Sequence, residues 1–308
     1  MNLHVRVGTR ASRLAIAQTN QVIDLLKNVS DGIRWEIVQI STEGDLDTAS
    51  PIDKISAPGV FTGNIERQLI AGKIDMAVHS AKDLPSREYP ELVIAAIPPR
   101  DNCEDVLISK AGLTLENLPA RSRIGTGSVR RRAMLLNSRP DLSIEKMRGN
   151  VETRLRKFDD GQLQAIVLSR IGLERLGLEK TISQILDPRQ FVPAAGQGAL
   201  AIQVRRDDRR LRELLSAIDD PISRRAYSLE KAVLNMLSAG CDAAIGVYAR
   251  PIGGEFAVTI AALDRNGGRR VDLEEKVPTS TPDAVLLDRI AAKLQSNDVK
   301  SLLGVGNG

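Results

Sequence analysis

Two short stretches place glycine, serine or asparagine directly before several arginines. The first is GTGSVRRR at residues 125–132 and the second is RGNVETR at residues 148–154. An apolar run precedes each stretch and helical spacing follows it, so we expect a strand, a tight turn and a helix start. The free N–H groups and dipole of a helix start favour an anion, and arginine binds carboxylate or phosphate through two parallel hydrogen bonds.

For either stretch alone, a basic helix face in contact with water is an equally good interpretation. The occurrence of two stretches in one segment favours an anion site. A third junction of the same kind lies near the N-terminus, where Gly8 to Ser12 follow an alternating apolar strand and precede helical spacing from Leu14 to Leu26. We therefore expect several strand-to-helix loops that share serine and arginine.

The loop after the apolar run Ile74 to His79 carries histidine, serine, lysine and aspartate together. Ligands of open α/β sheets bind beyond the carboxyl ends of strands, where this loop falls. No G-x-S-x-G elbow is present, which argues against a serine hydrolase. Asp83 is the candidate acid, since a carboxylate near cations keeps its charge and can stabilise a developing positive centre. The alternative is that Asp83 and Lys82 only cap a turn before Pro85.

The two cysteines, Cys103 and Cys241, lack the paired spacing of a metal site, so no metal is expected. Cys241 follows Ser238 to Gly240 at the end of an amphipathic pattern. A glycine before a cysteine allows an exposed thiol, and a small buried core residue is the equal alternative.

Composition limits the classes of function. The chain has 308 residues, 42% of them hydrophobic, so two or three domains are expected. The 43 basic and 39 acidic residues leave a net charge of +4, and only 3% of residues are aromatic, which argues against a nucleic-acid clamp. We find no leader pattern and no apolar run near 20 residues, so we expect a cytoplasmic protein without a membrane span.

Short apolar strands alternate with helical patterns through the first two thirds of the chain. They lie at residues 35–40, 74–79, 93–97, 106–109, 123–125, 144–147, 165–168 and 200–204. This alternation predicts an α/β fold with one or two mainly parallel, doubly wound sheets. Beyond Pro221, an amphipathic helix over residues 222–237, three strands and a closing helix over 282–294 predict a smaller α+β domain. Residues 42–63 are expected to form a long functional loop.

Taken together in this order, the loop motifs make the chain similar to the porphobilinogen deaminases, and the resemblance runs through nearly its whole length. The motifs are GTRAS at 8–12, T-x-GD at 42–45, VHSAKDLP at 78–85, GTGSVRR at 125–131, RGNV-x-TR at 148–154, GL-x-RLG at 172–177, PA-x-GQGA at 193–199 and GC at 240–241.

The resemblance implies an enzyme that condenses four porphobilinogen molecules into hydroxymethylbilane and releases ammonia, in porphyrin and haem biosynthesis. It implies a dipyrromethane cofactor bound to Cys241 by a thioether. It further implies that Asp83 contacts pyrrole N–H groups and supports the azafulvene cation formed on deamination. Each pyrrole carries an acetate and a propionate, and these carboxylates would need the cations of the arginine-rich loops as partners.

The resemblance also implies which residues bind the carboxylates of cofactor and substrate. They are Arg10, Ser12, Lys82, Thr126, Ser128, Arg130, Arg131, Arg148, Gly149, Asn150, Arg154 and Arg175. Supporting or lid positions are Asp45, Lys54, Phe61 and Gln197. The expected fold is two lobes like those of periplasmic binding proteins, at residues 1–98 with 198–218 and at 99–197, plus a C-terminal domain at 219–308 that carries the cysteine. A monomer is expected.

Three positions depart from the family pattern. Pro58 replaces a lysine in the loop of residues 42–63, which makes the loop less cationic and stiffer. Arg13 stands where a proline is usual, and an arginine that usually lies two residues after the position of Cys103 is absent. None of these changes affects Asp83 or Cys241.

The main competing hypothesis is a non-catalytic, two-lobed binding protein. Serine and arginine at helix starts would also close on a small polycarboxylate without chemistry. A covalent chromophore separates the two hypotheses, because only a deaminase carries one.

Overall fold

The computed structural model describes residues 3–41, 62–85, 89–240 and 242–305. Within them the chain forms three β-sheets. Its residues group into two compact units, Met1–Asp101 with Gly198–Arg225, and Asn102–Gln197 with Ala226–Gly308. None of the helices in these ranges is long and apolar enough to cross a membrane.

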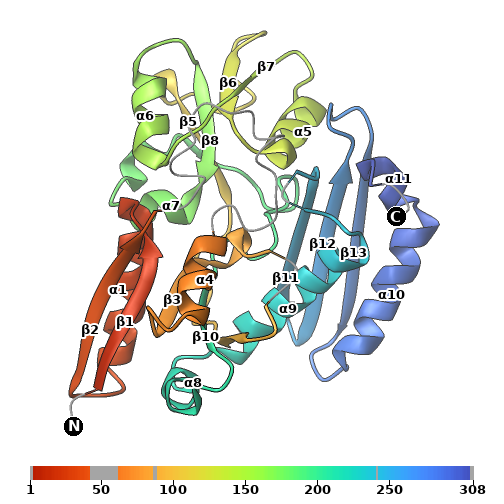
Figure 1. The fold of residues 1–308 in the computed structure, drawn as a ribbon. Coiled ribbons are helices and arrows are strands. Elements are labelled where there is room, and N and C mark those ends of the chain that lie inside the picture. The colour runs from red at the N-terminus through yellow and green to blue at the C-terminus, as the bar shows by residue number, and fades with distance from the viewer. Residues whose placement is uncertain (1–2, 42–61, 86–88, 241, 306–308) are drawn as a thin grey trace. The chain divides into compact units, whose positions relative to one another are not determined.

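The first unit contains a five-stranded sheet in the order β2-β1-β3-β10-β4 (Figure 1). Its strands are β1 (Leu3–Arg10), β2 (Ile33–Ile40), β3 (Met76–Ser80), β4 (Leu92–Ala96) and β10 (Leu200–Arg205). Its helices are α1 (Arg13–Lys27), α4 (Gly63–Ile70) and α8 (Arg209–Ser216). β1 runs parallel to β2 and β3, and β10 runs antiparallel to β3 and β4.

Successive side chains of each strand point to opposite faces of this sheet, and both faces are buried. Met76 and Val78 pack in one cluster with residues of α1 and α8, whereas Ala77 packs with Ile65 and Leu69 of α4 on the other face. Burial on both faces explains why these strands read as nearly continuous apolar runs.

The second unit holds another five-stranded sheet, in the order β7-β6-β8-β5-β9. Its strands are β5 (Asp105–Ser109), β6 (Arg123–Thr126), β7 (Ser143–Lys146), β8 (Ala165–Ser169) and β9 (Gln184–Ile185), and its helices are α5 (Val129–Ser138), α6 (Val151–Asp159) and α7 (Arg170–Glu174). β6 runs parallel to β7 and β8, but β5 runs antiparallel to β8 and β9. In each of these two sheets four strands share one direction and a single strand, β10 or β5, runs against them, so the expected α/β fold with mainly parallel sheets is confirmed and both sheets are mixed.

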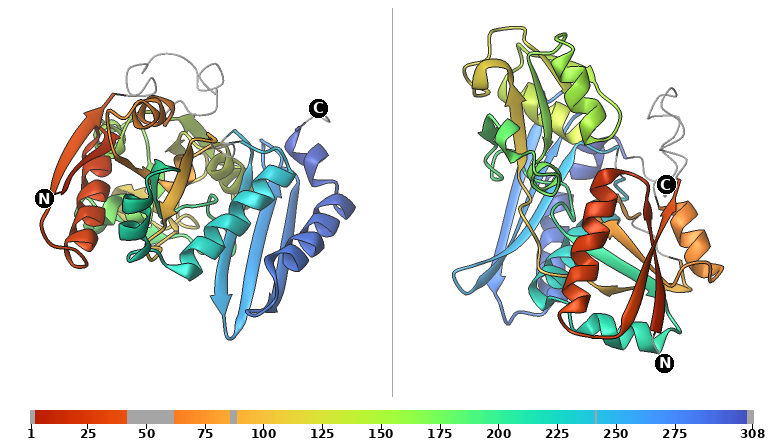
Figure 2. Two further views of the ribbon diagram at one scale, coloured as in Figure 1. Left: turned by 60° about the horizontal axis from the view of Figure 1, so that its bottom comes forward. Right: turned by 90° about the vertical axis from the view of Figure 1, so that its left-hand side faces the viewer.

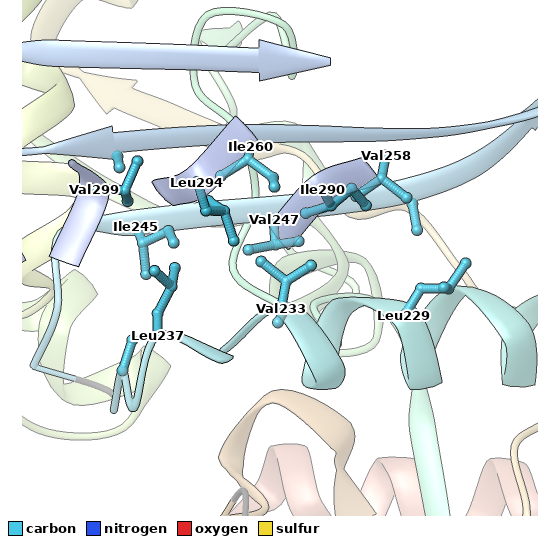
Figure 3. Packing of buried hydrophobic residues seen from close by; sticks show 14 of the residues in the cluster. Leu229, Val233, Leu237, Ile245, Val247, Val258, Ile260, Ile290, Leu294 and Val299 are labelled. Carbon is cyan, nitrogen blue, oxygen red and sulfur yellow. The ribbon is translucent and has the colours of Figure 1, made fainter. Parts of the chain in front are cut away.

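A three-stranded antiparallel sheet completes the second unit. It consists of β11 (Ile245–Ile252), β12 (Glu255–Leu263) and β13 (Arg270–Pro278), and α10 (Asp283–Ser296) lies alongside it (Figure 2). The core of this part joins the sheet to α9 (Pro221–Met236), α10 and α11 (Val299–Leu303). Leu229, Val233, Val247, Ile260 and Ile290 meet in it (Figure 3).

Glycine allows this sheet to approach the segment that precedes β10. A Cβ on Gly246 would overlap the backbone carbonyl of Val192, and the next residue, Val247, donates its N–H to the Pro193 carbonyl at 2.9 Å. Any side chain at position 246 would push the two segments apart.

Candidate active site

Three parallel strands of the second unit direct their following loops to one edge of the sheet. In the parallel register Thr126 pairs with Lys146, and Gly125 pairs with Ile166 of β8. The carboxyl ends of β6, β7 and β8 therefore lie at the same edge and lead into α5, α6 and α7. This brings together the candidate residues that the sequence spreads over residues 126–175, namely Thr126, Ser128, Arg148, Gly149, Asn150, Arg154 and Arg175.

The two arginine-rich loops contact each other directly. Met147 donates its N–H to the Thr126 carbonyl at 3.2 Å, and a Cβ on Gly127 would lie 2.5 Å from the Met147 carbonyl oxygen. Arg154 reaches back from α6, where its Nε donates to the Gly149 carbonyl at 2.8 Å. Glycine at position 127 thus permits the close contact that holds the two helix starts beside each other.

Ser128 and Asn150 cap the helices that follow them. The Ser128 hydroxyl accepts the N–H of Arg131 at 3.4 Å, and the Asn150 side-chain oxygen accepts the N–H of Thr153 at 2.8 Å. Ser12 does the same for α1, where it accepts the Ala15 N–H at 3.2 Å. These helix starts therefore present further backbone N–H groups, as an anion site requires.

Arg130 and Arg131 lie inside the protein. Their side chains are 4% and 7% exposed, so this part of α5 is not a basic face in contact with water. Both guanidinium groups contact the fully buried carboxylate of Asp105. Arg131 donates from Nε at 3.0 Å and from Nη2 at 2.8 Å, and Arg130 Nη2 lies 2.8 Å from the other oxygen.

One carboxylate faces two guanidinium groups here, so the cluster holds one excess positive charge close to the Ser128 helix start. Burial acts to raise the pKa of Asp105, but the charges of Arg130 and Arg131 outweigh it and hold the pKa well below its usual range. In this structure, Asp105 is the carboxylate that both arginines bind.

Gln197 and Glu230 connect this cluster to the rest of the second unit. Gln197 Nε2 donates to Asp105 at 2.8 Å and to the carbonyl of the buried Cys103 at 2.6 Å. Glu230 of α9 is fully buried and accepts the N–H of Gly196 at 2.6 Å and that of Ala249 at 2.8 Å. Gln197 therefore supports Asp105, and Glu230 ties α9 to the neighbouring Gly196.

Sequence reasoning missed Asp105 and Glu230 as candidates. The available signal for Glu230 is an acidic residue on the apolar stripe of α9, four residues after Ala226 and three before Val233. Asp105 gives a weaker signal, since an acid at the start of a buried strand is common.

In the first unit, the carboxyl ends of the parallel strands β1 and β3 lie at one edge of the sheet. Arg10 is the last residue of β1 and Ser12 follows that strand. Ser80 is the last residue of β3, and Lys82 and Asp83 lie in the short 3₁₀ turn Ala81–Asp83 that follows it. Ser80 accepts a hydrogen bond at Oγ from Gln18 of α1 at 2.8 Å. Asp83 is half-buried, and its carboxylate accepts no hydrogen bond from the residues described, which disfavours the turn-cap interpretation.

Four of the predicted positions fall outside the described residues. They are Asp45, Lys54, Phe61 and Cys241. The segment that leads to Cys241 is described, and Leu237 and Ala239 are buried in the core of α9 and the three-stranded sheet.

Known proteins are similar to this chain over the segments that contain these residues. The family model for the porphobilinogen deaminase dipyrromethane cofactor-binding domain matches residues 5–213. A porphobilinogen deaminase of Geobacillus kaustophilus is 40% identical over 308 residues, which cover 98% of this chain and 99% of that protein. A probable porphobilinogen deaminase of Methanopyrus kandleri is 44% identical over 270 residues, 87% of this chain and 90% of its own.

Among solved structures, the methionine-binding protein MetQ is similar with a TM-score of 0.46 and 16% sequence identity. The match covers 72% of this chain and 92% of that chain. Nothing about a ligand follows from so distant a similarity.

Proposed function

The chain belongs to the porphobilinogen deaminase family, and from this premise we propose which of its residues carry the activity. The activity is the condensation of porphobilinogen into hydroxymethylbilane on a dipyrromethane cofactor, a step of tetrapyrrole biosynthesis. Membership in a family of enzymes leaves no support for the alternative of a non-catalytic polycarboxylate-binding protein. We propose further that the enzyme acts in the cytoplasm as a monomer.

The chemistry of the donor set fits a cofactor with two carboxylates on each pyrrole. Arg148, Arg154 and Arg175 are half-buried at the edge where three strands end, and Ser128 and Asn150 begin the helices there. The edge is cationic, because Asp105 neutralises only one of its two buried arginines. Residues that could hold the cofactor are therefore present in the second unit.

We assign two different roles to these cations. Arg148, Arg154 and Arg175, with Arg10 and Lys82 of the first unit, bind carboxylates of cofactor and substrate. Arg130 and Arg131 supply the excess charge, and their guanidinium groups are fixed before any ligand arrives, which limits the reorganisation that binding requires. When bound, the dipyrromethane supplies the pyrrole carbon to which new units are added, and Cys241 is the residue that holds it.

Asp83 carries the catalytic role in this proposal. The observation that supports it is a half-buried carboxylate, at the carboxyl end of a central strand, that accepts no hydrogen bond from the residues described. Such a group can accept the pyrrole N–H of the substrate. It also places a negative charge opposite the positive charge that develops as the amino group leaves as ammonia.

The test is single-turnover ammonia release from Asp83→Asn enzyme that carries its cofactor. Loss of one preorganised electrostatic group costs ~2.7–4 kcal/mol of transition-state stabilisation, or a rate reduction on the order of a hundred- to a thousand-fold. Folding and cofactor attachment should survive, because asparagine keeps the size of the side chain.

Two control variants carry the same aspartate-to-asparagine substitution at other positions. Asp24→Asn changes an exposed carboxylate on α1 and should leave the rate unchanged. Asp45→Asn changes a second position that matches the family and should cost much less than Asp83→Asn. Release at the parental rate from Asp83→Asn would move the catalytic role to another residue.

A further inference from the structure

A cluster of buried polar side chains adjoins the strand that leads to Asp83. His79 of β3 and Gln203 of β10 lie on the same face of the first sheet, because Ala77 pairs with Gln203 and His79 pairs with Ala201 in antiparallel register. Diagonal neighbours of this kind are within reach of long side chains. The helix α4 packs on that face, beside β3 and β10 (Figure 1), and its Glu66 accepts a hydrogen bond at Oε1 from Gln203 Nε2 at 3.0 Å.

Each member of this cluster leaves one polar atom without a hydrogen-bond partner among the described residues. The atoms are His79 Nε2, Gln203 Oε1, Glu66 Oε2 and Thr62 Oγ1. All four residues are at most 5% exposed. Buried polar atoms normally have partners, and an internal water with two to four polar neighbours commonly provides them.

The imidazole of His79 is neutral at physiological pH. Burial lowers its pKa to about 4, although Gln203 and the negative charge of Asp83 both favour the protonated ring. The ionisable groups around it are Asp83 from the turn after β3 and Glu66 from α4, the latter through Gln203. From α1, the neutral Gln18 contacts the neighbouring Ser80.

We propose that His79 is a positioning residue for Asp83, held by a water molecule bound between His79 Nε2, Gln203 Oε1 and Glu66 Oε2. The two oxygens accept the protons of the water, and the water accepts the N–H at Nε2, so these three of the four atoms gain a partner. A fixed neutral ring holds the end of β3 and places no cation beside Asp83. The carboxylate is therefore not paired with an imidazolium and can face the cation that develops on the substrate. This inference rests on the role assigned to Asp83 above.

The first test compares two replacements of His79 in the cofactor-loaded enzyme. The amide of glutamine reaches the position of Nε2, whereas that of asparagine reaches only the position of Nδ1. His79→Gln should keep kcat within ~3-fold, and His79→Asn should lower kcat ~10-fold or more with KM unchanged, as loss of a transition-state interaction requires. The same exchanges at His4, an exposed residue paired with Glu36, should change neither constant.

The second test observes the imidazole of His79 directly and needs no change at that position. The chain has two histidines, so a His4→Gln protein labelled with ¹⁵N shows one imidazole ring. We expect a neutral ring protonated at Nε2 from pH 5 to 8. A ring that titrates near pH 6.5, or one protonated at Nδ1, would overturn the proposal.

These outcomes separate this inference from the assignment of Asp83. If Asp83→Asn releases ammonia at the parental rate, the catalytic assignment fails, whatever the state of His79. If Asp83→Asn is impaired but His79→Gln and His79→Asn lower kcat equally, only the positioning role of His79 is wrong.

Discussion

Arg131 binds the carboxylate of Asp105 through two nitrogens, with Nε at 3.0 Å and Nη2 at 2.8 Å from the same oxygen. Both residues are buried, and Arg130 contacts the second oxygen of Asp105. The arginines that the sequence marks as ligands of an external anion are thus held by an internal one. This arrangement makes Asp105 a determinant of stability as well as of the charge at the site.

Asp105→Asn should destabilise the protein by about 3–5 kcal/mol, because two buried guanidinium groups lose their counter-ion. Urea unfolding at pH 7 measures the loss. Asp272→Asn is the matched control, since Asp272 is 56% exposed beside Arg270 and its exchange should cost only a small fraction of that amount. Equal stability of Asp105→Asn and the parental protein would show that the buried pairs contribute nothing net.

The free energy of unfolding should fall on acidification in two separate pH ranges. The lowered pKa of His79 means that the unfolded chain binds more protons than the native state between about pH 6.5 and 4, so unfolding becomes easier as pH falls through this range. The lowered pKa of Asp105 adds stability that is complete above its unfolded value of ~3.9 and is lost as pH falls towards its native value.

Urea midpoints measured from pH 8 to pH 3 test both pH ranges. The decline from pH 6.5 to 4 should be shallower in His79→Gln, and the decline below pH 4 should be shallower in Asp105→Asn. Variants that reproduce the parental curve, displaced by a constant amount, would contradict these assignments.

Arg131→Ala and Arg148→Ala should impair the enzyme for different reasons. Arg148 is half-buried at the strand edge, so its loss should leave unfolding nearly unchanged and remove a charge-assisted carboxylate contact worth ~1.5–3 kcal/mol. Arg131→Ala also opens the buried cluster and should lower the free energy of unfolding by about 3–5 kcal/mol.

Urea unfolding and the extent of cofactor attachment, measured together, separate the two effects. Arg148→Lys should restore part of the cofactor attachment that Arg148→Ala loses, and Arg131→Lys should restore little of the stability that Arg131→Ala loses. The reason is that only a planar guanidinium donates two parallel hydrogen bonds to one carboxylate. Two alanine variants with parental stability, cofactor content and rate would show that these loops do not bind carboxylates.

Local sequence patterns were sufficient for the strand-to-helix junctions. Ser12, Ser128 and Asn150 follow apolar strands and cap helices, as small polar residues before helical spacing predict. The three-stranded sheet and the helices α9 and α10 were also predicted from turns and periodicity, whereas α11 was not. The strands β11, β12 and β13 are antiparallel, as a meander requires. Each of these features depends on residues close together in the chain.

Features that depend on distant residues were not predictable in this way. The direction of β10 is set by its pairing with β3, whose residues precede it by more than 100 positions, so its antiparallel orientation has no local signal. Asp105 lies 26 residues from Arg131 and 92 from Gln197, and only the folded chain brings these groups together.

Attachment of a covalent dipyrromethane to Cys241 can be tested by the intact mass of the purified protein. We predict an excess over the sequence mass that equals two linked pyrrole units. Peptide mapping should place this excess on Cys241 and leave Cys103 free, since the latter is buried beside Gln197. Fully active enzyme with an unmodified Cys241 would contradict covalent attachment of the cofactor at this residue, and an adduct on Cys103 would reassign the attachment site.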